Sequence, residues 1–106
     1  MTLPKPVAAY FAAEKGNDAE ALARCFAADG VVRDEGRTMK GVAAIKQWNA
    51  EARNKYHHSV DPIDAVSRDA KTVVRARVSG DFPGSPVILE HIFQLDGDKI
   101  ASLEIQ

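Results

Sequence analysis

One aspartate of this chain, Asp34, is the strongest candidate for general acid–base chemistry. It ends a β-branched stretch that starts at residues 31–32, and residues 35–36, Glu-Gly, supply a tight reversal after it. Side chains alternate along a strand, so Val32 and Asp34 share one face. If Val32 points into the core, the Asp34 carboxylate lies at the lip of a cavity, partly desolvated, with its proton affinity raised toward that of a general base. The alternative is a turn residue that is solvated or paired with Arg37.

A histidine, His91, interrupts the apolar face of a strand that we predict over residues 87–95. An imidazole in the middle of an apolar face needs a hydrogen-bond partner inside the protein or on a ligand. His91 is therefore a second candidate for chemistry. The alternative is a core histidine that is satisfied by the protein itself.

Tyr10 is the third polar candidate, because its hydroxyl can donate to a ligand oxygen from the first predicted helix. The alternative is a tyrosine that packs with its ring and reaches water with its hydroxyl. The aromatic residues near these candidates are core by default and pocket walls if a pocket exists. The predicted ligand-binding set is Phe11, Phe26, Val32, Trp48, His58 and Phe93.

The sequence predicts no metal site. His57 and His58 are adjacent, so on a strand they point to opposite faces and cannot both bind one ion. The Asp-Gly-Asp run at residues 96–98 lacks the other ligands of a calcium loop and is better explained as a hairpin turn. Cys25 is the single cysteine, so no intramolecular disulfide forms.

The elements that position these residues are three helices followed by strands. The first helix starts near residues 4–6 and ends at Gly16, and the second runs from Asn17 to Gly30, with Glu20 completing a capping box. A short hairpin follows over residues 31–39, and a third helix spans residues 41–55. Strands are predicted at residues 56–67, with Pro62 at a bulge or edge, and at residues 72–81, 87–95 and 99–105.

This order predicts a single α+β domain over residues 1–106, with the helices covering the concave face of a strongly bent, mostly antiparallel sheet. The 106 residues carry 14 basic and 15 acidic side chains, a net charge of −1, without a basic stripe. This balance argues against nucleic-acid binding, and no apolar run is long enough to cross a membrane. The amphipathic N-terminal segment and the single cysteine favour a cytoplasmic location.

Charged and β-branched side chains share the sheet face that points away from the helices. Arg75, Arg77 and Glu90 share this face with Val73, Ile88 and Ile92. Such a mixture on a broad face predicts a contact surface, and we expect a homodimer through it. The alternative is a solvated sheet face crossed by salt bridges.

Four stretches in this order make the chain resemble a known superfamily: residues 10–26 of the helical pair, residues 26–34, residues 40–48 with Gly41, Ile45 and Trp48, and residues 82–100. The chain resembles the nuclear transport factor 2-like superfamily and, within it, the SnoaL-like group of small cone-shaped domains. The group includes ketosteroid isomerases, dehydratases, hydrolases and polyketide cyclases, together with domains that have no catalysis. Its members commonly pair through the convex sheet face.

The resemblance to the isomerases implies roles for the three polar candidates. Asp34 matches the position of the general base, Tyr10 that of a pocket phenol, and His91 that of an acidic oxyanion donor. An imidazole in place of the acid is a departure from the isomerase pattern. Two readings follow: a cofactor-independent enzyme that moves a proton on a small, mainly apolar, oxygen-bearing molecule, or a non-catalytic binding or dimerisation domain.

Overall fold

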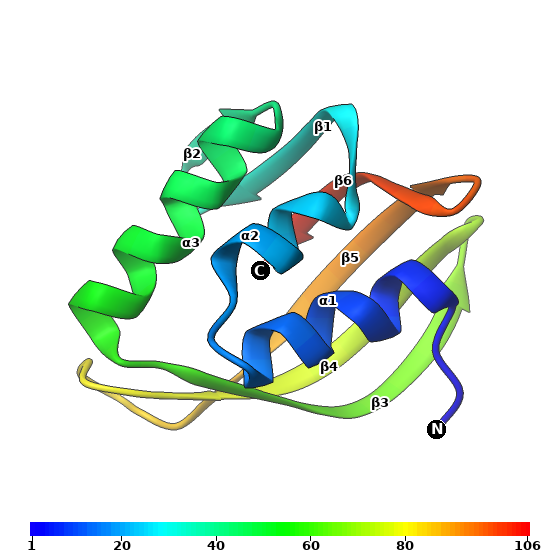
Figure 1. Cartoon of the computed structure of the whole chain (residues 1–106). Coiled ribbons are helices and arrows are strands. Elements are labelled where there is room, and N and C mark those ends of the chain that lie inside the picture. The colour runs from blue at the N-terminus through cyan, green and yellow to red at the C-terminus, as the bar shows by residue number, and fades with distance from the viewer.

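A computed structural model describes all 106 residues and contains three helices and six strands (Figure 1). The helices are α1 (Lys5–Lys15), α2 (Ala19–Arg24) and α3 (Val42–Tyr56). The strands are β1 (Phe26–Asp34), β2 (Arg37–Lys40), β3 (Ser59–Arg68), β4 (Lys71–Ser79), β5 (Val87–Asp96) and β6 (Lys99–Ile105). None of the helices is both long and apolar enough to span a bilayer.

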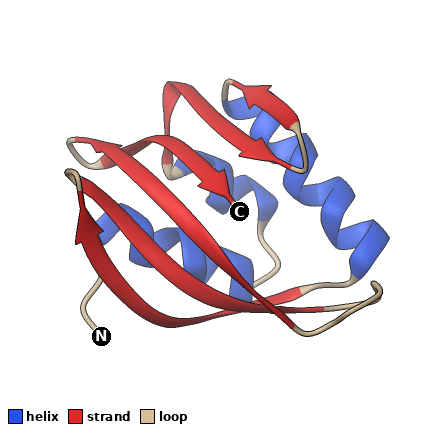
Figure 2. Cartoon of the chain, turned by 180° about the vertical axis from the view of Figure 1, so that it is seen from behind, coloured by secondary structure: helices blue, strands red, loops and turns tan.

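All six strands form one sheet in the order β2-β1-β6-β5-β4-β3. Every neighbouring pair is antiparallel except β1 and β6, which run parallel. The long strands β3 to β5 curve around α1, and Figure 2 shows the three helices together behind the sheet. The predicted fold, an α+β domain with three helices on one face of a bent and mostly antiparallel sheet, is confirmed.

The core lies between the helices and the concave sheet face, because each element turns its apolar side there. Val7 and Tyr10 of α1, Leu22 of α2 and Ile45 of α3 are completely buried. The facing strand residues are buried with them: Val32, Val74, Ala76, Phe93, Ile100 and Leu103.

The second helix is shorter than the sequence predicted, which is a correction. It begins after Asp18, whose carboxylate accepts a hydrogen bond from the Ala21 backbone N–H, and it ends at Arg24 instead of Gly30. The residues from Phe26 onward form the start of β1, with an irregularity in its pairing to β6 before Val31. A Cβ on Gly30 would lie 2.9 Å from the Ala27 carbonyl oxygen, so this glycine permits a close backbone approach instead of ending a helix.

Irregularities of the backbone determine the pairing register of β3 and the residue at which this strand starts. The pairing register of β3 shifts between Pro62 and Asp64, and β3 is the edge strand, as the proline predicted. The strand starts at Ser59 instead of residue 56, because α3 continues to Tyr56 and His57 then adopts a left-handed conformation with φ of 48°.

The outer face of the sheet carries the predicted mixture of side chains. Arg75 is paired with Asp64, and Arg68 lies 3.3 Å from Glu90. Ile88, more than half exposed, stands opposite Arg77 in the register of β4 and β5. Salt bridges and exposed apolar side chains thus occur on the same face, and the homodimer stays a prediction.

Candidate functional site

A cavity of about 490 Å³ opens at one end of the sheet. Its walls come from the end of α1, the second half of α3, the turn between β1 and β2 with its flanking residues, and the segment from His58 into the start of β3. The last residues of β4 and β6, the first half of β5 and the loop between β4 and β5 complete them. The apolar lining residues are Trp48, Ala52, Tyr56, Val60, Val78, Phe82, Val87, Leu89 and Ile105. The ionisable lining residues are Glu14, Asp34, Glu35, Arg37, Glu51, Lys55, Tyr56, His58 and His91.

Asp34 lies on this cavity, at the end of β1 and directly before the turn to β2. The indole N–H of Trp48 donates a hydrogen bond to its Oδ2 atom at 3.1 Å. Burial raises the pKa of Asp34, and the neighbouring Glu35 charge raises it further, while the Trp48 hydrogen bond and His58 oppose the shift. The donor to this carboxylate is therefore Trp48 of α3, whereas the sequence had offered pairing with Arg37 as the alternative.

His91 also lines the cavity and is only 2% exposed. Its Nδ1 atom is buried and has no hydrogen-bond partner. Burial lowers the pKa of His91 to about 4, so the imidazole is neutral at pH 7. The protein therefore does not supply a hydrogen-bond partner for each of the two ring nitrogens. This differs from the alternative left by the sequence, a core histidine whose hydrogen bonds are all made within the protein.

Tyr10 is completely buried and is not among the residues that line the cavity. Its ring packs edge-on against Phe11, Phe26 and Phe93, at centroid distances of 5.2, 6.2 and 5.3 Å. The hydroxyl has no partner, and burial raises the pKa of Tyr10 well above its ordinary value. The predicted ligand-binding residues Phe11, Phe26, Val32 and Phe93 belong to the same core cluster. Of the predicted ligand-binding residues, only Trp48 and His58 reach the cavity lining.

A buried polar cluster at the cavity wall was not predicted. Glu14 of α1 accepts a hydrogen bond from the side-chain amide of Asn49 at 3.2 Å and pairs with Arg53 at 3.0 Å. Its Oε1 atom is also 3.4 Å from Nε2 of His58. Burial acts to raise the pKa of Glu14, but His58, Asn49 and Arg53 together lower it below its ordinary value.

One sequence signal could have revealed this cluster. Glu14 falls at helical spacing after Val7, Tyr10 and Phe11, so the pattern places it on the apolar face of its helix. A carboxylate there needs a buried partner. Arg53 suits a helix C-terminus by its charge, and in the fold its guanidinium also reaches back to Glu14.

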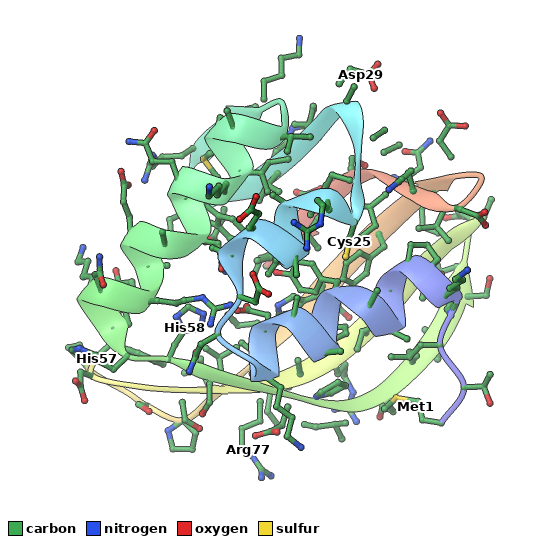
Figure 3. The ribbon with its side chains drawn as sticks, in the orientation of Figure 1. Met1, Cys25, Asp29, His57, His58 and Arg77 are labelled. Atoms are coloured by element: carbon green, nitrogen blue, oxygen red, sulfur yellow. The ribbon has the colours of Figure 1, made fainter.

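The two adjacent histidines have different surroundings (Figure 3). His57 points outward and pairs with Asp81 at 2.9 Å, and both side chains are exposed. His58 points inward between α1 and α3, and its side chain is 9% exposed. No three His, Cys, Asp or Glu side chains are grouped as a set of metal ligands.

Comparison with known sequences and structures assigns the family. The sequence profile of the SnoaL-like domain matches residues 7–103. The chain belongs to the SnoaL-like family. Among proteins with curated functions, none matches it significantly.

Solved structures similar to this SnoaL-like domain cover nearly its whole length. A Sinorhizobium meliloti protein described as a candidate polyketide cyclase is 44% identical over 98% of this chain and 95% of its own, with a TM-score of 0.94. A Catenulispora acidiphila protein of ketosteroid isomerase-like fold, crystallised with trimethylamine, is 28% identical over 99% and 86%, with a TM-score of 0.85. A nuclear transport factor 2-like protein from Cytophaga hutchinsonii, 10% identical over 95% and 85% with a TM-score of 0.78, shares the fold.

The arrangement in this SnoaL-like domain brings groups of different proton affinity to one cavity. A carboxylate of raised pKa, a neutral imidazole and a buried carboxylate–imidazole pair all reach one cavity with apolar walls. Such groups differ in proton affinity because their surroundings differ, which is the usual basis for dividing acid and base roles.

Proposed function

We propose that this SnoaL-like domain binds a small, mainly apolar, oxygen-bearing molecule and moves a proton on it, with Asp34 as the general base. The observation that carries the proposal is the position of Asp34: its carboxylate lines the cavity, is held by Trp48 and has a raised pKa. A base of this kind is active when ionised and binds the abstracted proton more strongly than a fully solvated aspartate does.

The cavity walls indicate the class of ligand. Nine of the 19 lining residues are hydrophobic, and a volume of about 490 Å³ is in the range of small-molecule pockets. The 44% identical Sinorhizobium protein, described as a candidate polyketide cyclase, and the isomerase-like fold of the Catenulispora protein support oxygen-bearing ring compounds.

In the proposed reaction, Asp34 removes a proton from a carbon next to a ligand carbonyl. The electrons of the broken C–H bond form a carbon–carbon double bond, and negative charge develops on the carbonyl oxygen. Donors near that oxygen stabilise the enolate. Return of the proton to the same or another carbon completes an exchange or an isomerisation and regenerates the carboxylate.

The test is proton exchange on a simple ketone. 2-Tetralone is incubated with the protein in D₂O, and loss of its α-proton signals is followed by ¹H NMR. We expect exchange faster than in buffer, and a decrease of about 10²-fold or more in Asp34→Asn, the range for losing a general base. Asp29→Asn is the matched control, since Asp29 lies on the same strand but is exposed and absent from the cavity. Exchange no faster than in buffer, or undiminished in Asp34→Asn, would refute the proposal.

A binding function without catalysis is the second candidate, and the trimethylamine bound to the Catenulispora relative favours it. The cavity of this chain combines the aromatic rings of Tyr56 and Phe82, 5.9 Å apart, with the carboxylates Glu35 and Glu51. Aromatic faces and carboxylates together recognise alkylated ammonium groups. Titration with trimethylammonium chloride, followed by NMR, tests this candidate. Shifts that disappear in Tyr56→Leu support it, and the absence of saturable shifts refutes it.

The outer sheet face is the surface that we propose for a homodimer. Val66 and Ile88 are both more than half exposed there, next to the Arg75–Asp64 and Arg68–Glu90 pairs. Apolar side chains inside a charged border are typical of contact surfaces.

A further inference from the structure

His58 holds a fixed position on the cavity wall because the backbone on both sides of it is constrained. His57 caps α3 in a left-handed conformation, which turns the chain so that the next side chain enters the protein. Gly80 packs directly against this turn: a Cβ there would lie 2.7 Å from the Tyr56 carbonyl oxygen and 3.1 Å from the His58 Cα. The Asp81 N–H also donates to the Tyr56 carbonyl oxygen at 2.7 Å. The imidazole therefore has little freedom to move away from the cavity.

One nitrogen of this imidazole has a partner and the other has none. Nε2 faces the Glu14 carboxylate at 3.4 Å, whereas Nδ1 is buried and has no hydrogen-bond partner. The side chain is about nine-tenths buried and lines the cavity. A buried N–H without an acceptor is costly, and a ligand oxygen can supply that acceptor.

The groups around Glu14 keep its negative charge in place beside His58. Arg53 and Asn49 both hold Glu14 Oε1, and the pKa of Glu14 is lowered. The hydrogen bond to Glu14 raises the pKa of His58, and the backbone carbonyl of Ala52 raises it further, in spite of the opposing effect of burial. An imidazolium donates from both nitrogens, so with Nε2–H facing Glu14 the Nδ1–H is left for a ligand.

We propose that His58 is the hydrogen-bond donor of this cavity, taking a carbonyl or carboxylate oxygen of the ligand at Nδ1 with Glu14 as its counter-ion. The proposal rests on the proposed function only in assuming that the same cavity holds the ligand. It names the ligand class more closely: an apolar ring system that bears a hydrogen-bond-accepting oxygen. A charge-assisted donor is a strong anchor for such an oxygen, and it stabilises negative charge that develops there.

In this proposal the ligand oxygen accepts a hydrogen bond from His58, whereas the isomerase resemblance implied Tyr10 and His91 as its donors. Tyr10 is outside the cavity lining, and the His91 imidazole is neutral at pH 7. His58 lies on the same cavity as Asp34, and its charge acts on Asp34. A ligand with its carbonyl oxygen at His58 and its acidic carbon at Asp34 would use both groups at once.

The experiment measures binding and the state of the imidazole together. The probes are 2-acetonaphthone, a neutral carbonyl compound, and 2-naphthoate, a carboxylate of similar size. Dissociation constants are measured by NMR titration for the wild type, His58→Gln and the neighbouring control His57→Gln. Ring ¹⁵N signals of the histidines are recorded in the wild type with and without each probe, which requires no variant to fold. Thermal unfolding checks that His58→Gln is folded, and Glu14→Gln serves as a second variant that keeps His58 itself.

We expect at least one probe to bind the wild type and to shift the His58 Nδ1 signal. Binding should weaken about tenfold or more in His58→Gln, the loss of a hydrogen bond to a charged group, and remain unchanged in His57→Gln. In Glu14→Gln the loss should be greater for 2-naphthoate, which depends most on the imidazolium charge. Binding of both probes would show that the oxygen is recognised as an acceptor, and binding of 2-naphthoate alone that it is recognised as an anion.

Three results would overturn the proposal: neither probe binds, a probe binds His58→Gln as tightly as the wild type, or the His58 ring signals stay unmoved at saturation. These results differ from failure of the proposed function. If Asp34-dependent exchange is missing while His58-dependent binding remains, the proton-transfer proposal is wrong and the donor assignment stands.

Discussion

Acidification should destabilise this protein through one buried imidazole, His91. In the folded protein burial lowers the pKa of His91 to about 4, against an ordinary value of 6.5. Between these two values the unfolded chain binds a proton at this position that the folded protein does not bind. Stability is therefore fully present above pH 6.5 and is lost as the pH falls toward 4.

The magnitude follows from the difference between the two pKa values. The interval from 6.5 to about 4, at about 1.4 kcal/mol for each pH unit, gives a total loss of about 3 kcal/mol from the free energy of unfolding. At pH 5 the proton-binding factor, 1 + 10^(pKa − pH), is about 30 times larger for His91 in the unfolded chain than in the folded protein. This ratio corresponds to about 2 kcal/mol. That is a large part of the stability of a small domain.

The assay compares the wild type with His91→Leu by urea denaturation at several pH values between 4.5 and 7.5. Other titrating groups, such as Glu14, Asp34 and His58, contribute to both proteins and largely cancel in the difference. At pH 7.5 the variant should be about as stable as the wild type or more stable, because it also removes the unpartnered Nδ1 atom. By pH 5 the variant should have gained about 2 kcal/mol relative to the wild type. Two parallel stability curves would refute the argument that His91 is held neutral by burial.

Three further substitutions test separate parts of the structure. Arg53→Met should lower the free energy of unfolding by about 3 kcal/mol at pH 7, because it removes a cation from the buried Glu14 carboxylate; an unchanged urea midpoint would contradict the pairing. Gly80→Ala should lower the thermal midpoint and weaken 2-naphthoate binding, because its Cβ would press on the backbone before His58; wild-type values for both would contradict the contact. Ile88→Glu should convert a dimer to a monomer in light scattering at micromolar concentration; a monomeric wild type, or a dimer that survives the change, would exclude this face.

Most of the fold could be predicted because local patterns and tertiary packing agree. The strand over residues 87–95 alternates cleanly, and the hairpin before α3 has its turn residues in place. The second helix was predicted too long because Leu22, Cys25 and Phe26 fall at helical spacing. Phe26 instead pairs with Ile100 of β6, a partner far along the chain that no local pattern reveals.

The site could be predicted only in part, because periodicity gives the direction of a side chain but not its depth. Asp34 and His91 were placed on inward faces, and both line the cavity. Tyr10 also points inward, but it lies within the core behind the cavity. The partners of Glu14 come from α3 and from His58, which lies between α3 and β3, so they depend on how the helices pack.

The parallel pairing of β1 with β6 affects how the chain reaches its fold during synthesis. In the finished sheet β1 lies beside β6 (Figure 1), although the ribosome makes these two strands far apart in time. Val32 of β1 pairs with Leu103 of β6. Until β6 emerges, the hairpin of β1 and β2 has no neighbouring strand, and the apolar faces of Phe26 and Val32 have no sheet to join. Closing so long a loop is entropically costly, and non-local pairings slow folding. The hairpin of β1 and β2 can therefore join the rest of the sheet only after the last strand has been made and lies between β1 and β5.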